Sequence, residues 1–594
     1  MSTENVSTRW NLREMFATDD DWRKTLSETM SMVDALASRK GQLAESAAAL
    51  WETVRQYEAI QKNLEALFVF AHSNFDQDMS DSTAKALFES ASSAATRIGE
   101  KLSFMAPELM SHTMEEFHAY CQEKPELKLY EFFAKDFFEQ KEHILSAEME
   151  NLMVRMGDLG GSFQKIFNDL AVNDIEFPEL TTPEGEKVKV SEAEYGHALM
   201  NPDAGYRNEF YNALLGGYGK HINTIASTYY GSVKYDVFNA KSHNYTNSRN
   251  RAMKANHVPE AVYDNLVSTV RANTKPLHQY ISLRKKTLGL ETYHFSDMMY
   301  PLVKDAARKY SYEEACDLVL KATAVLGEDY TSLLKQAMEN RWIDVYPAPN
   351  KRSGAYSTGA YRPHHPYVLL NFNGTLDSVF TLAHELGHSL HSYFSNQTQP
   401  FIYADYTIFC AEVASTLNEE LLSRYLYSHS QSNEEKALLL CKKLDDIRST
   451  FYRQTMFADF ELQTHQMVEN GQPLLPKGLC ELHKNLNELY YGKDLEVDTF
   501  LSYEWARIPH FYRAFYVYQY ATGISAALGI AERIFNLGEE GVKDYRRFLT
   551  TGGSDHPIEL LKIAGVDMAS PQPVLDTIKI FCDTLEKLEK ILEA

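Results

Sequence analysis

Hydrophobic residues recur at helical spacing along most of the chain. Long stretches place apolar positions three or four residues apart, with few Gly or Pro residues to interrupt them. In the first 170 residues this pattern predicts successive antiparallel helices at about residues 20–38, 45–75 and 83–104, with further helices after residues 114 and 145. The same spacing continues over residues 191–340 and again from residue 376 to the end. The pattern therefore predicts a mainly α-helical protein.

Two short regions depart from this spacing. Residues 173–190 alternate polar and apolar positions on either side of Thr182-Pro183-Glu184-Gly185, which predicts a β-hairpin. Residues 345–373 are rich in Pro and Gly, and Tyr367–Phe372 is the clearest strand among them. A helix is expected directly afterwards, at about residues 376–394, with Thr375 as its cap. A small sheet should therefore precede this helix.

Composition and charge narrow the function classes. The chain has 594 residues, 44% hydrophobic and 24% charged, with a net charge of −23, which is ordinary for a globular protein. The negative charge and the lack of a Lys/Arg-rich run disfavour nucleic acid and anionic membranes as partners. No stretch of about 18 apolar residues could span a bilayer. The first ten residues do not resemble a signal peptide, and the six cysteines are scattered without close pairs. We expect a cytoplasmic protein.

The helix after the predicted strand contains His384-Glu385-Leu386-Gly387-His388. Two histidines four residues apart project from one helix face, so both imidazoles can bind one Zn²⁺ ion. Glu385 can then take a proton from a water molecule that the zinc activates. The small residues Ala383 and Gly387 indicate close packing of the backbone at this point. The alternative is a pair of core histidines beside a buried ion pair.

A catalytic zinc needs a third protein ligand and one open position. His391 lies one turn too far along the helix, and a metzincin would have His where this chain has Phe394. A carboxylate from the next helix fits better. Glu412 stands among small and apolar residues, where an unpaired carboxylate would be costly, so we predict it as the third ligand. Glu419, two turns further, is predicted to orient a ligand histidine; the alternative is a surface acid.

Residues 503–523 are unusually rich in aromatic side chains. A buried aromatic helix explains part of this density. Near a metal, however, a histidine and tyrosine hydroxyls can donate hydrogen bonds to a developing oxyanion. His510, Tyr516 and Tyr520 are therefore candidate catalytic residues, and Tyr512 is a candidate substrate-binding residue.

The segment Gly354–Tyr361 is rich in Gly and Tyr. In a zinc peptidase the substrate backbone can pair with an exposed strand edge, and this segment could bind it. Tyr356 and Gly359 are the predicted substrate-binding residues here. The alternative is a mobile loop without a role in binding.

Four separated segments together resemble one family. Residues 371–374, 379–389, 411–419 and 508–512 are similar, in this order, to the oligoendopeptidase F branch of the thimet oligopeptidase (M3) metallopeptidases. Trp10-Asn11-Leu12 and the hairpin region also look similar, so the resemblance covers nearly the whole chain. It implies a mainly α, multi-helix, two-lobed oligopeptidase fold that encloses a deep channel, with a small β-sheet beside the HExxH helix.

The resemblance also implies a site of the gluzincin type. The family's ligands to one Zn²⁺ ion match His384, His388 and Glu412, its general base matches Glu385, and its transition-state histidine matches His510. Its tyrosines are carried over to Tyr516 and Tyr520, although the spacing after His510 differs from the mammalian branch. Within this chain, we expect an N-terminal helical region at 1–110, a helical lobe ending in the hairpin at 111–190, and the M3-type catalytic domain at 191–594.

The predicted function is that of a cytoplasmic zinc-dependent oligoendopeptidase. It would hydrolyse internal bonds of short unstructured peptides through a zinc-activated water, with no nucleic acid or membrane partner. A zinc carboxypeptidase is an alternative, because Arg507 or Arg513 could bind a free C-terminal carboxylate. A non-catalytic peptide-binding relative is another, although the intact histidine and glutamate set argues against it. The same ligands could also hold Co²⁺ or Mn²⁺.

Overall fold

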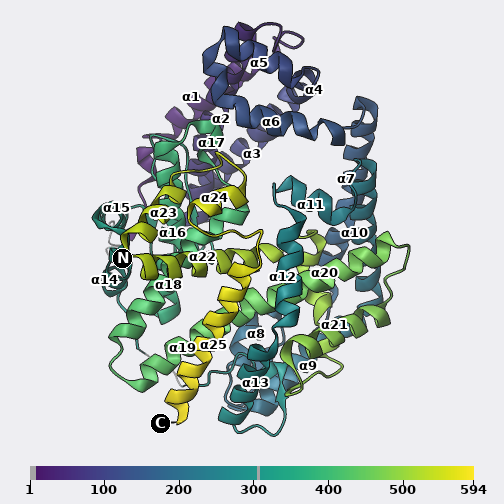
Figure 1. Ribbon diagram of the computed structural model, residues 1–594, viewed down its shortest axis with the longest axis vertical. Helices are drawn as coiled ribbons and strands as arrows, with labels where there is room; N and C mark the ends of the chain where they lie inside the picture. Colours follow the sequence, from purple (N-terminus) through teal and green to yellow (C-terminus); the bar gives the residue numbers. More distant parts are fainter. Residues whose placement is uncertain (1–7, 304–307, 594) are drawn as a thin grey trace. The chain divides into compact units, whose positions relative to one another are not determined.

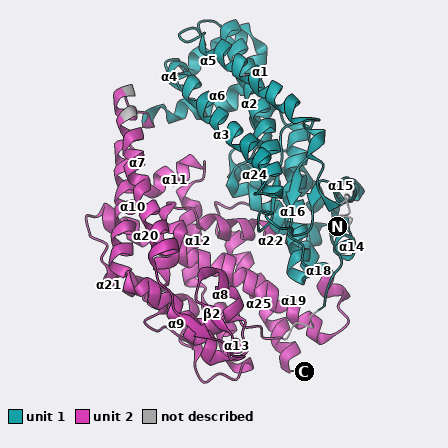
Figure 2. Ribbon diagram, turned by 180° about the vertical axis from the view of Figure 1, so that it is seen from behind, with its two compact units in different colours: residues 1–142, 308–425, 530–566 teal, residues 143–307, 426–529, 567–594 magenta. Residues whose placement is uncertain are grey.

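The computed structural model describes residues 8–303 and 308–593 and is mainly α-helical, with three small sheets (Figure 1). The prediction that the first ten residues are not a signal peptide concerns a segment of which residues 1–7 lie outside the described residues. The chain divides into two compact units, coloured separately in Figure 2. Unit 1 comprises residues 1–142, 308–425 and 530–566; unit 2 comprises residues 143–307, 426–529 and 567–594. The domain boundaries expected at residues 110 and 190 stay a prediction.

Unit 1 begins with the helices that the sequence predicts. Thr18, Ser46 and Asp81 cap the first three helices through their side chains, which fixes where each helix starts. The helices of this unit are α1 (Asp19–Ala37), α2 (Ala47–Gln77), α3 (Ser82–Leu102), α4 (Met105–Met110), α5 (Met114–Glu123), α6 (Glu131–Glu139), α14 (Tyr312–Thr323), α15 (Glu328–Glu339), α16 (Leu376–Thr398), α17 (Phe401–Ala404), α18 (Ile408–His429), α23 (Glu539–Leu549) and α24 (Pro557–Ile563).

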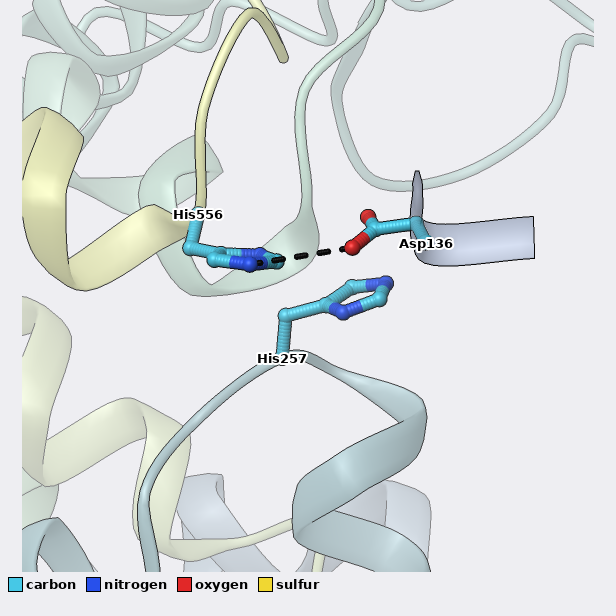
Figure 3. Close-up of side chains that lie close together, drawn as sticks. All are labelled: Asp136, His257 and His556. Atoms are coloured by element: carbon cyan, nitrogen blue, oxygen red, sulfur yellow. Dashed lines mark ion pairs between the residues drawn. The ribbon is translucent and has the colours of Figure 1, made fainter. Parts of the chain in front are cut away.

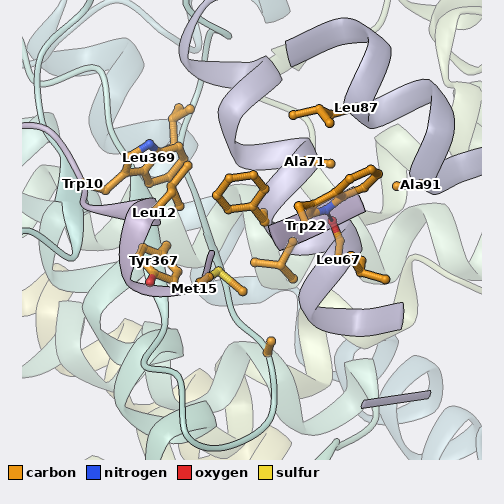
Figure 4. Close-up of a cluster of buried hydrophobic side chains, with 13 residues drawn as sticks. Trp10, Leu12, Met15, Trp22, Leu67, Ala71, Leu87, Ala91, Tyr367 and Leu369 are labelled. Carbon is orange, nitrogen blue, oxygen red and sulfur yellow. Dashed lines mark hydrogen bonds between the residues drawn. The ribbon is translucent and has the colours of Figure 1, made fainter. Parts of the chain in front are cut away.

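A buried cluster joins the N-terminal helices to the strands of unit 1 (Figure 4). Trp22 of α1 is 1% exposed, and its indole nitrogen donates to the carbonyl of Leu67 on α2 at 2.9 Å. Tyr367 and Leu369 belong to strand β6 (Tyr367–Leu369), and the ring of Trp10 meets Tyr367 edge-on with centroids 6.3 Å apart. This apolar packing holds the strand in place from the side of the N-terminal helices.

The sheet of unit 1 has the order β4-β6-β5 and leads into α16. Strand β4 (Ile343–Asp344) runs parallel to β6, whereas β5 (Tyr356–Thr358) is antiparallel to it, with Ser357 opposite Val368. After a turn at Gly374, Thr375 and Ser378 form a capping box that starts α16. The hydroxyls of Ser357 and Ser389 lie 2.8 Å apart and connect β5 to α16. The predicted sheet beside the HExxH helix is therefore confirmed.

Unit 2 contains the predicted hairpin, in which β1 (Glu179–Thr181) and β2 (Lys187–Lys189) pair antiparallel. A second pair, β3 (Tyr293–His294) and β7 (Leu495–Glu496), is parallel. The helices of this unit are α7 (Ala147–Asp169), α8 (Glu192–Leu199), α9 (Ala204–Lys220), α10 (Ile222–Ser242), α11 (Ser248–Ala255), α12 (Glu260–Ala272), α13 (Lys275–Thr287), α19 (Asn433–Ile447), α20 (Arg453–Glu469), α21 (Pro476–Tyr491) and α25 (Gln572–Glu593). The last residues of α18 and the first part of α22 (Tyr518–Leu537) belong to unit 2, and the rest of each helix belongs to unit 1.

An ion pair ties α6 to the start of α24 within unit 1. The Oδ1 atom of Asp136 lies 3.6 Å from Nε2 of His556. Figure 3 marks this ion pair with a dashed line. The ring of Phe132 meets the His556 ring edge-on, with centroids 5.2 Å apart. In the described part of the chain, no helix is both long and apolar enough to cross a membrane.

Candidate active site

Helices α16 and α18 of unit 1 bring three donor atoms together. The Nε2 atoms of His384 and His388 are 3.2 Å apart. Oε2 of Glu412 lies 3.3 Å from the first nitrogen and 3.5 Å from the second. We call these three atoms the donor triangle. Donors that bind zinc tetrahedrally at about 2.0–2.1 Å are about 3.3 Å from one another, so the spacing of the triangle fits one zinc ion.

The residues of the triangle are also electrostatically coupled. Burial lowers the pKa of His384, but the carboxylates of Glu412 and Glu419 outweigh it and raise this pKa to about 10. Burial raises the pKa of Glu412, and the two histidines reverse the effect and hold it well below its usual range. The carboxylate of Glu412 is therefore stabilised by positive charge at the imidazoles. A bound metal cation would supply that positive charge instead.

Glu385 lies in the same turn of α16, between the two histidines in sequence. Its side chain is 6% exposed, and its Oε2 atom has no hydrogen-bond partner among the described residues. Burial raises the pKa of Glu385, while His384 and His388 act against this rise. Buried polar atoms are normally paired, so an unpaired carboxylate oxygen beside a group that could hold a metal makes Glu385 a candidate for chemistry rather than stability.

Glu419 contacts the other side of His384. Its Oε1 atom lies 3.1 Å from Nδ1 of His384, so the two side chains form a carboxylate–histidine pair. When this carboxylate holds a proton on Nδ1, the lone pair of Nε2 is available to bind a metal, and the orientation of the ring is fixed. The structure thus places Glu419 where it can orient a ligand histidine.

Close packing of α16 on α18 sets the distances within the triangle. A methyl group at Gly387 would lie 2.6 Å from the carbonyl oxygen of Ala414 and 2.6 Å from Cα of Ser415. Both are backbone atoms, so any residue larger than Gly would push the helices apart. The Ser415 hydroxyl also donates to Oε2 of Glu412 at 3.1 Å. Gly387 therefore allows Glu412 to reach the two histidines.

Sequence reasoning missed Asn418, which connects the two helices. Its amide nitrogen donates to the carbonyl of Ala383 at 3.1 Å, and its amide oxygen accepts from the hydroxyl of Tyr330 at 3.0 Å. The side chain is fully buried. An Asn directly before a candidate Glu on an otherwise apolar helix face was the available signal, because a buried amide must have partners.

In unit 2, His510, Tyr516 and Tyr520 gather into what we call the aromatic cluster. The rings of His510 and Tyr516 are stacked at 6.2 Å, and Tyr520 meets both edge-on, at 6.1 Å and 5.5 Å. His510 follows Pro509 in a short 3-10 helix and is exposed. Partial burial and the charge of Arg513 lower the pKa of His510.

Tyr512 points elsewhere. Its hydroxyl lies 2.7 Å from the hydroxyl of Thr228 on α10, and its ring is stacked on Phe167 of α7 at 4.7 Å. Burial raises the pKa of Tyr512. This side chain packs its loop against α7 and α10, and its predicted role in substrate binding stays a prediction.

The other predicted substrate-binding residues lie on or beside the edge strand β5. The Tyr356 hydroxyl donates to Oδ2 of the buried Asp76 at 2.9 Å, so its polar end is engaged inside unit 1. Gly359 follows the strand, where a methyl group would lie 3.3 Å from Cα of Pro366. The backbone of β5 pairs with β6 on one side, and its other edge has no strand partner among the described residues.

The remaining candidates are placed as follows. His391 is 1% exposed and stacks on Tyr406 with centroids 3.8 Å apart, outside the donor triangle. Arg507 is paired with Glu192, its Nε atom lying 3.0 Å from the carboxylate. Arg513 lies over the Tyr516 ring at 3.9 Å. Of the two arginines considered for a carboxypeptidase, one therefore already binds a carboxylate of the protein itself.

Comparisons with known proteins agree over the whole chain. The model described as Peptidase family M3 matches residues 198–580, and the model described as Oligopeptidase F matches residues 108–177. The chain is 39% identical over 583 residues to Oligopeptidase PepF of Bacillus subtilis, covering 98% of this chain and 87% of that protein. It is 36% identical to Group B oligopeptidase PepB of Streptococcus agalactiae, covering 98% and 97%. The structure of oligoendopeptidase-F from Enterococcus faecium aligns with a TM-score of 0.76 and 32% identity, over 97% of this chain and 99% of that one.

Proposed function

We propose a function for this chain from one premise: it belongs to peptidase family M3 and is a metallo-oligopeptidase of the oligoendopeptidase F type. The proposed reaction is the zinc-dependent hydrolysis of internal bonds in short unstructured peptides. The donor triangle of His384, His388 and Glu412, with the unpaired carboxylate of Glu385 beside it, is the observation that carries this proposal. Nitrogen and carboxylate donors at this spacing suit zinc.

The residues of α16 and α18 have separate roles in the proposed reaction. His384, His388 and Glu412 hold the metal, and Glu419 orients His384. When bound, zinc polarises the scissile carbonyl and lowers the pKa of a water molecule. Glu385 takes the proton from the attacking water and then transfers it to the leaving nitrogen. Its Oε2 atom is buried and has no hydrogen-bond partner among the described residues, so it is available to accept that proton.

The aromatic cluster supplies hydrogen-bond donors in this proposal. His510 and one of the two tyrosines, Tyr516 or Tyr520, donate to the oxygen that becomes negatively charged during the attack. Strand β5 contributes its unpaired edge, which can accept the backbone of an extended peptide. Pairing through the backbone depends little on the side chains of the substrate, in keeping with a peptidase for short peptides of varied sequence.

The cysteines support a reducing compartment. All six are free in the structure, and no two of them form a disulfide. Free thiols persist in the cytoplasm, whereas secreted proteins usually pair theirs. We propose the cytoplasm as the site of action on this basis.

The proposal is tested with an internally quenched peptide that is blocked at both ends. We expect internal cleavage, which stops when a chelator removes the metal and returns when Zn²⁺ is added back. Cleavage that persists after complete metal removal would contradict the proposed role of the metal. A metal-loaded protein that cuts only the same peptide with a free C-terminus would be a carboxypeptidase instead.

A further inference from the structure

The aromatic cluster depends on a loop with an unusual backbone. Residues 513–517 join the short 3-10 helix at Pro509–Tyr512 to α22. Within this link, Phe515 has a φ angle of +54°, the left-handed conformation that favours glycine. A bulky aromatic residue is rarely found there, and strained residues of this kind persist only where surrounding contacts hold them.

A buried carboxyl on α20 provides such a contact. The backbone N–H of Phe515 donates to Oε1 of Glu461 at 2.7 Å. Glu461 is fully buried, and its second oxygen, Oε2, has no hydrogen-bond partner among the described residues. In a turn exposed to solvent, water would accept the hydrogen bond from this N–H, and no protein acceptor would be needed. An acidic side chain inside the core is costly, so its presence here calls for a purpose beyond stability.

The Phe515 ring is held from the same direction. It is 1% exposed and lies against His465 of α20 and Tyr263 of α12, with centroid distances of 4.6 Å and 5.6 Å. His465 in turn hydrogen-bonds to the carbonyl of Glu461 at 2.8 Å. Both the backbone and the side chain of Phe515 are thus fixed by the region around Glu461.

The other end of the loop is anchored independently. Phe511, next to His510, packs against Phe460 and Phe457 of α20, at 5.1 Å and 5.5 Å. With Phe511 and Phe515 both fixed on α20, the intervening chain has little freedom. His510 directly precedes the first anchor, and Tyr516 directly follows the second. The stacking of these two rings at 6.2 Å follows from the two anchors.

We propose that Glu461 is a positioning residue: it holds the left-handed turn at Phe515 and thereby sets the aromatic cluster in its converging arrangement. This inference rests on the proposed function only for its catalytic consequence. The hydrogen bond itself needs one acceptor oxygen but no negative charge. Burial raises the pKa of Glu461 to about 8, against the effect of His465, so the carboxyl is mostly neutral at pH 7. Glutamine should therefore replace it well.

Three variants of the full-length, zinc-loaded protein separate the possibilities. Glu461→Met keeps the size of the side chain but removes the acceptor. Glu461→Gln keeps the acceptor. Thr455→Val, also fully buried on α20, removes a hydroxyl that donates to the carbonyl of Phe451 and serves as the matched control. The measurements are kcat and KM on the blocked peptide, zinc content, and amide hydrogen exchange resolved to single residues over 510–520.

We expect Glu461→Met to lower kcat at least about tenfold with KM and zinc content nearly unchanged, since small displacements of catalytic groups cost about that much or more. The Phe515 amide should lose its protection from exchange. Glu461→Gln should restore both, and Thr455→Val should change neither. Equal exchange and equal kcat in the Met variant and the control would overturn the inference.

Two further measurements decide the outcome if the Met variant alone does not. If Glu461→Met does not fold, wild-type exchange decides: a Phe515 amide that exchanges as fast as an unstructured peptide would overturn the proposed contact. A His510→Ala variant with normal kcat would count against the proposed function, while the exchange data would still judge the contact. If His510→Ala lowers kcat and Glu461→Met does not, the positioning role is wrong and the proposed function stands.

Discussion

The donor triangle and the aromatic cluster differ in how the chain positions their side chains. In the triangle, His384 and His388 belong to one regular helix, and a second helix contributes Glu412 at van der Waals packing distance. In the cluster, His510 and Tyr516 lie on irregular backbone whose shape depends on side chains of α20. Helical periodicity sets the first arrangement, and tertiary contacts set the second.

This difference has consequences for mutation. The triangle is formed by side chains of two closely packed helices, so it should be sensitive to its own members and to the α16–α18 contact. A loop held at two anchors should be sensitive to residues that contact neither substrate nor metal. The predictions below test this contrast, beginning with the greatest expected loss of activity.

Replacing Glu385 should have the greatest effect. Glu385→Gln keeps the shape of the side chain but cannot accept a proton, so kcat should fall about 10²–10⁴-fold, the usual contribution of a general base. Zinc content should stay at the wild-type level, because Glu385 is not a member of the triangle. Steady-state kinetics and metal analysis on the same sample check both points. Near-normal turnover would exclude Glu385 as the base.

His510→Ala tests the aromatic cluster. Loss of one oxyanion donor costs about 10²–10³-fold in kcat, and KM should change little because the contact forms mainly in the transition state. Tyr512→Phe is the matched control, since its hydroxyl contacts Thr228 rather than the cluster, and its kcat should remain within a few-fold of wild type. If both variants lower kcat equally, the loop as a whole matters and His510 has no special role.

Gly387→Ala tests the contact between α16 and α18. The added methyl group would overlap the backbone of α18, which costs about 1–3 kcal/mol of stability and displaces Glu412 from the histidines. Thermal unfolding and zinc affinity should both fall. The control is Gly99→Ala in α3, where a methyl group meets no atom within 4 Å and should stabilise the helix by about 0.5–1 kcal/mol. Unchanged zinc affinity in Gly387→Ala would show that the triangle tolerates helix displacement.

The last of these predictions concerns the pH dependence of stability and involves no loss of activity. Burial raises the folded-state pKa of Glu461 from 4.5 to about 8; Asp236 of α10 adds to the rise, while His465 and the N–H of Phe515 act against it. The folded state therefore binds this proton more tightly than the unfolded state. The resulting stabilisation is complete below about pH 4.5 and is lost as the pH rises to about 8.

Glu461→Gln removes that titration. The melting temperature of Glu461→Gln relative to wild type should therefore increase between pH 5.5 and pH 8.5, whereas the difference for Thr455→Val should stay constant. Tyr229 and Tyr263 also face Glu461, but burial keeps their pKa values well above this range, so they do not titrate in it. A pH-independent difference for the Gln variant would mean that Glu461 is already ionised at pH 5.5.

The sequence could predict the triangle because its rules are local. Histidines four residues apart must share a helix face, and a glutamate among apolar neighbours must find a partner. The strand at Tyr367 followed by a capped helix was equally visible from a short β-prone run and the turn residues around it. The helices of the N-terminal region followed from apolar spacing, with ends that differ from the structure by two residues or fewer.

The sequence could not predict how the loop is held. The contact between Glu461 and the Phe515 amide joins residues 54 positions apart, and that between Tyr512 and Thr228 joins residues 284 apart. No periodicity relates such residues. A left-handed conformation at a phenylalanine also contradicts the local preference, and it exists only because the tertiary structure supports it. The density of aromatic residues in 503–523 marked this segment as a candidate site but did not predict how its rings are arranged.

The most direct test of the metal site is the number of zinc ions per chain in two variants, measured after identical dialysis. Glu412→Ala removes a member of the donor triangle, whereas Glu385→Gln alters its neighbour on α16. We predict one zinc ion per chain in wild type and in Glu385→Gln, and a clear loss of zinc in Glu412→Ala. Full zinc retention in Glu412→Ala, together with normal cleavage of the blocked peptide, would contradict the assignment of His384, His388 and Glu412 as the ligand set.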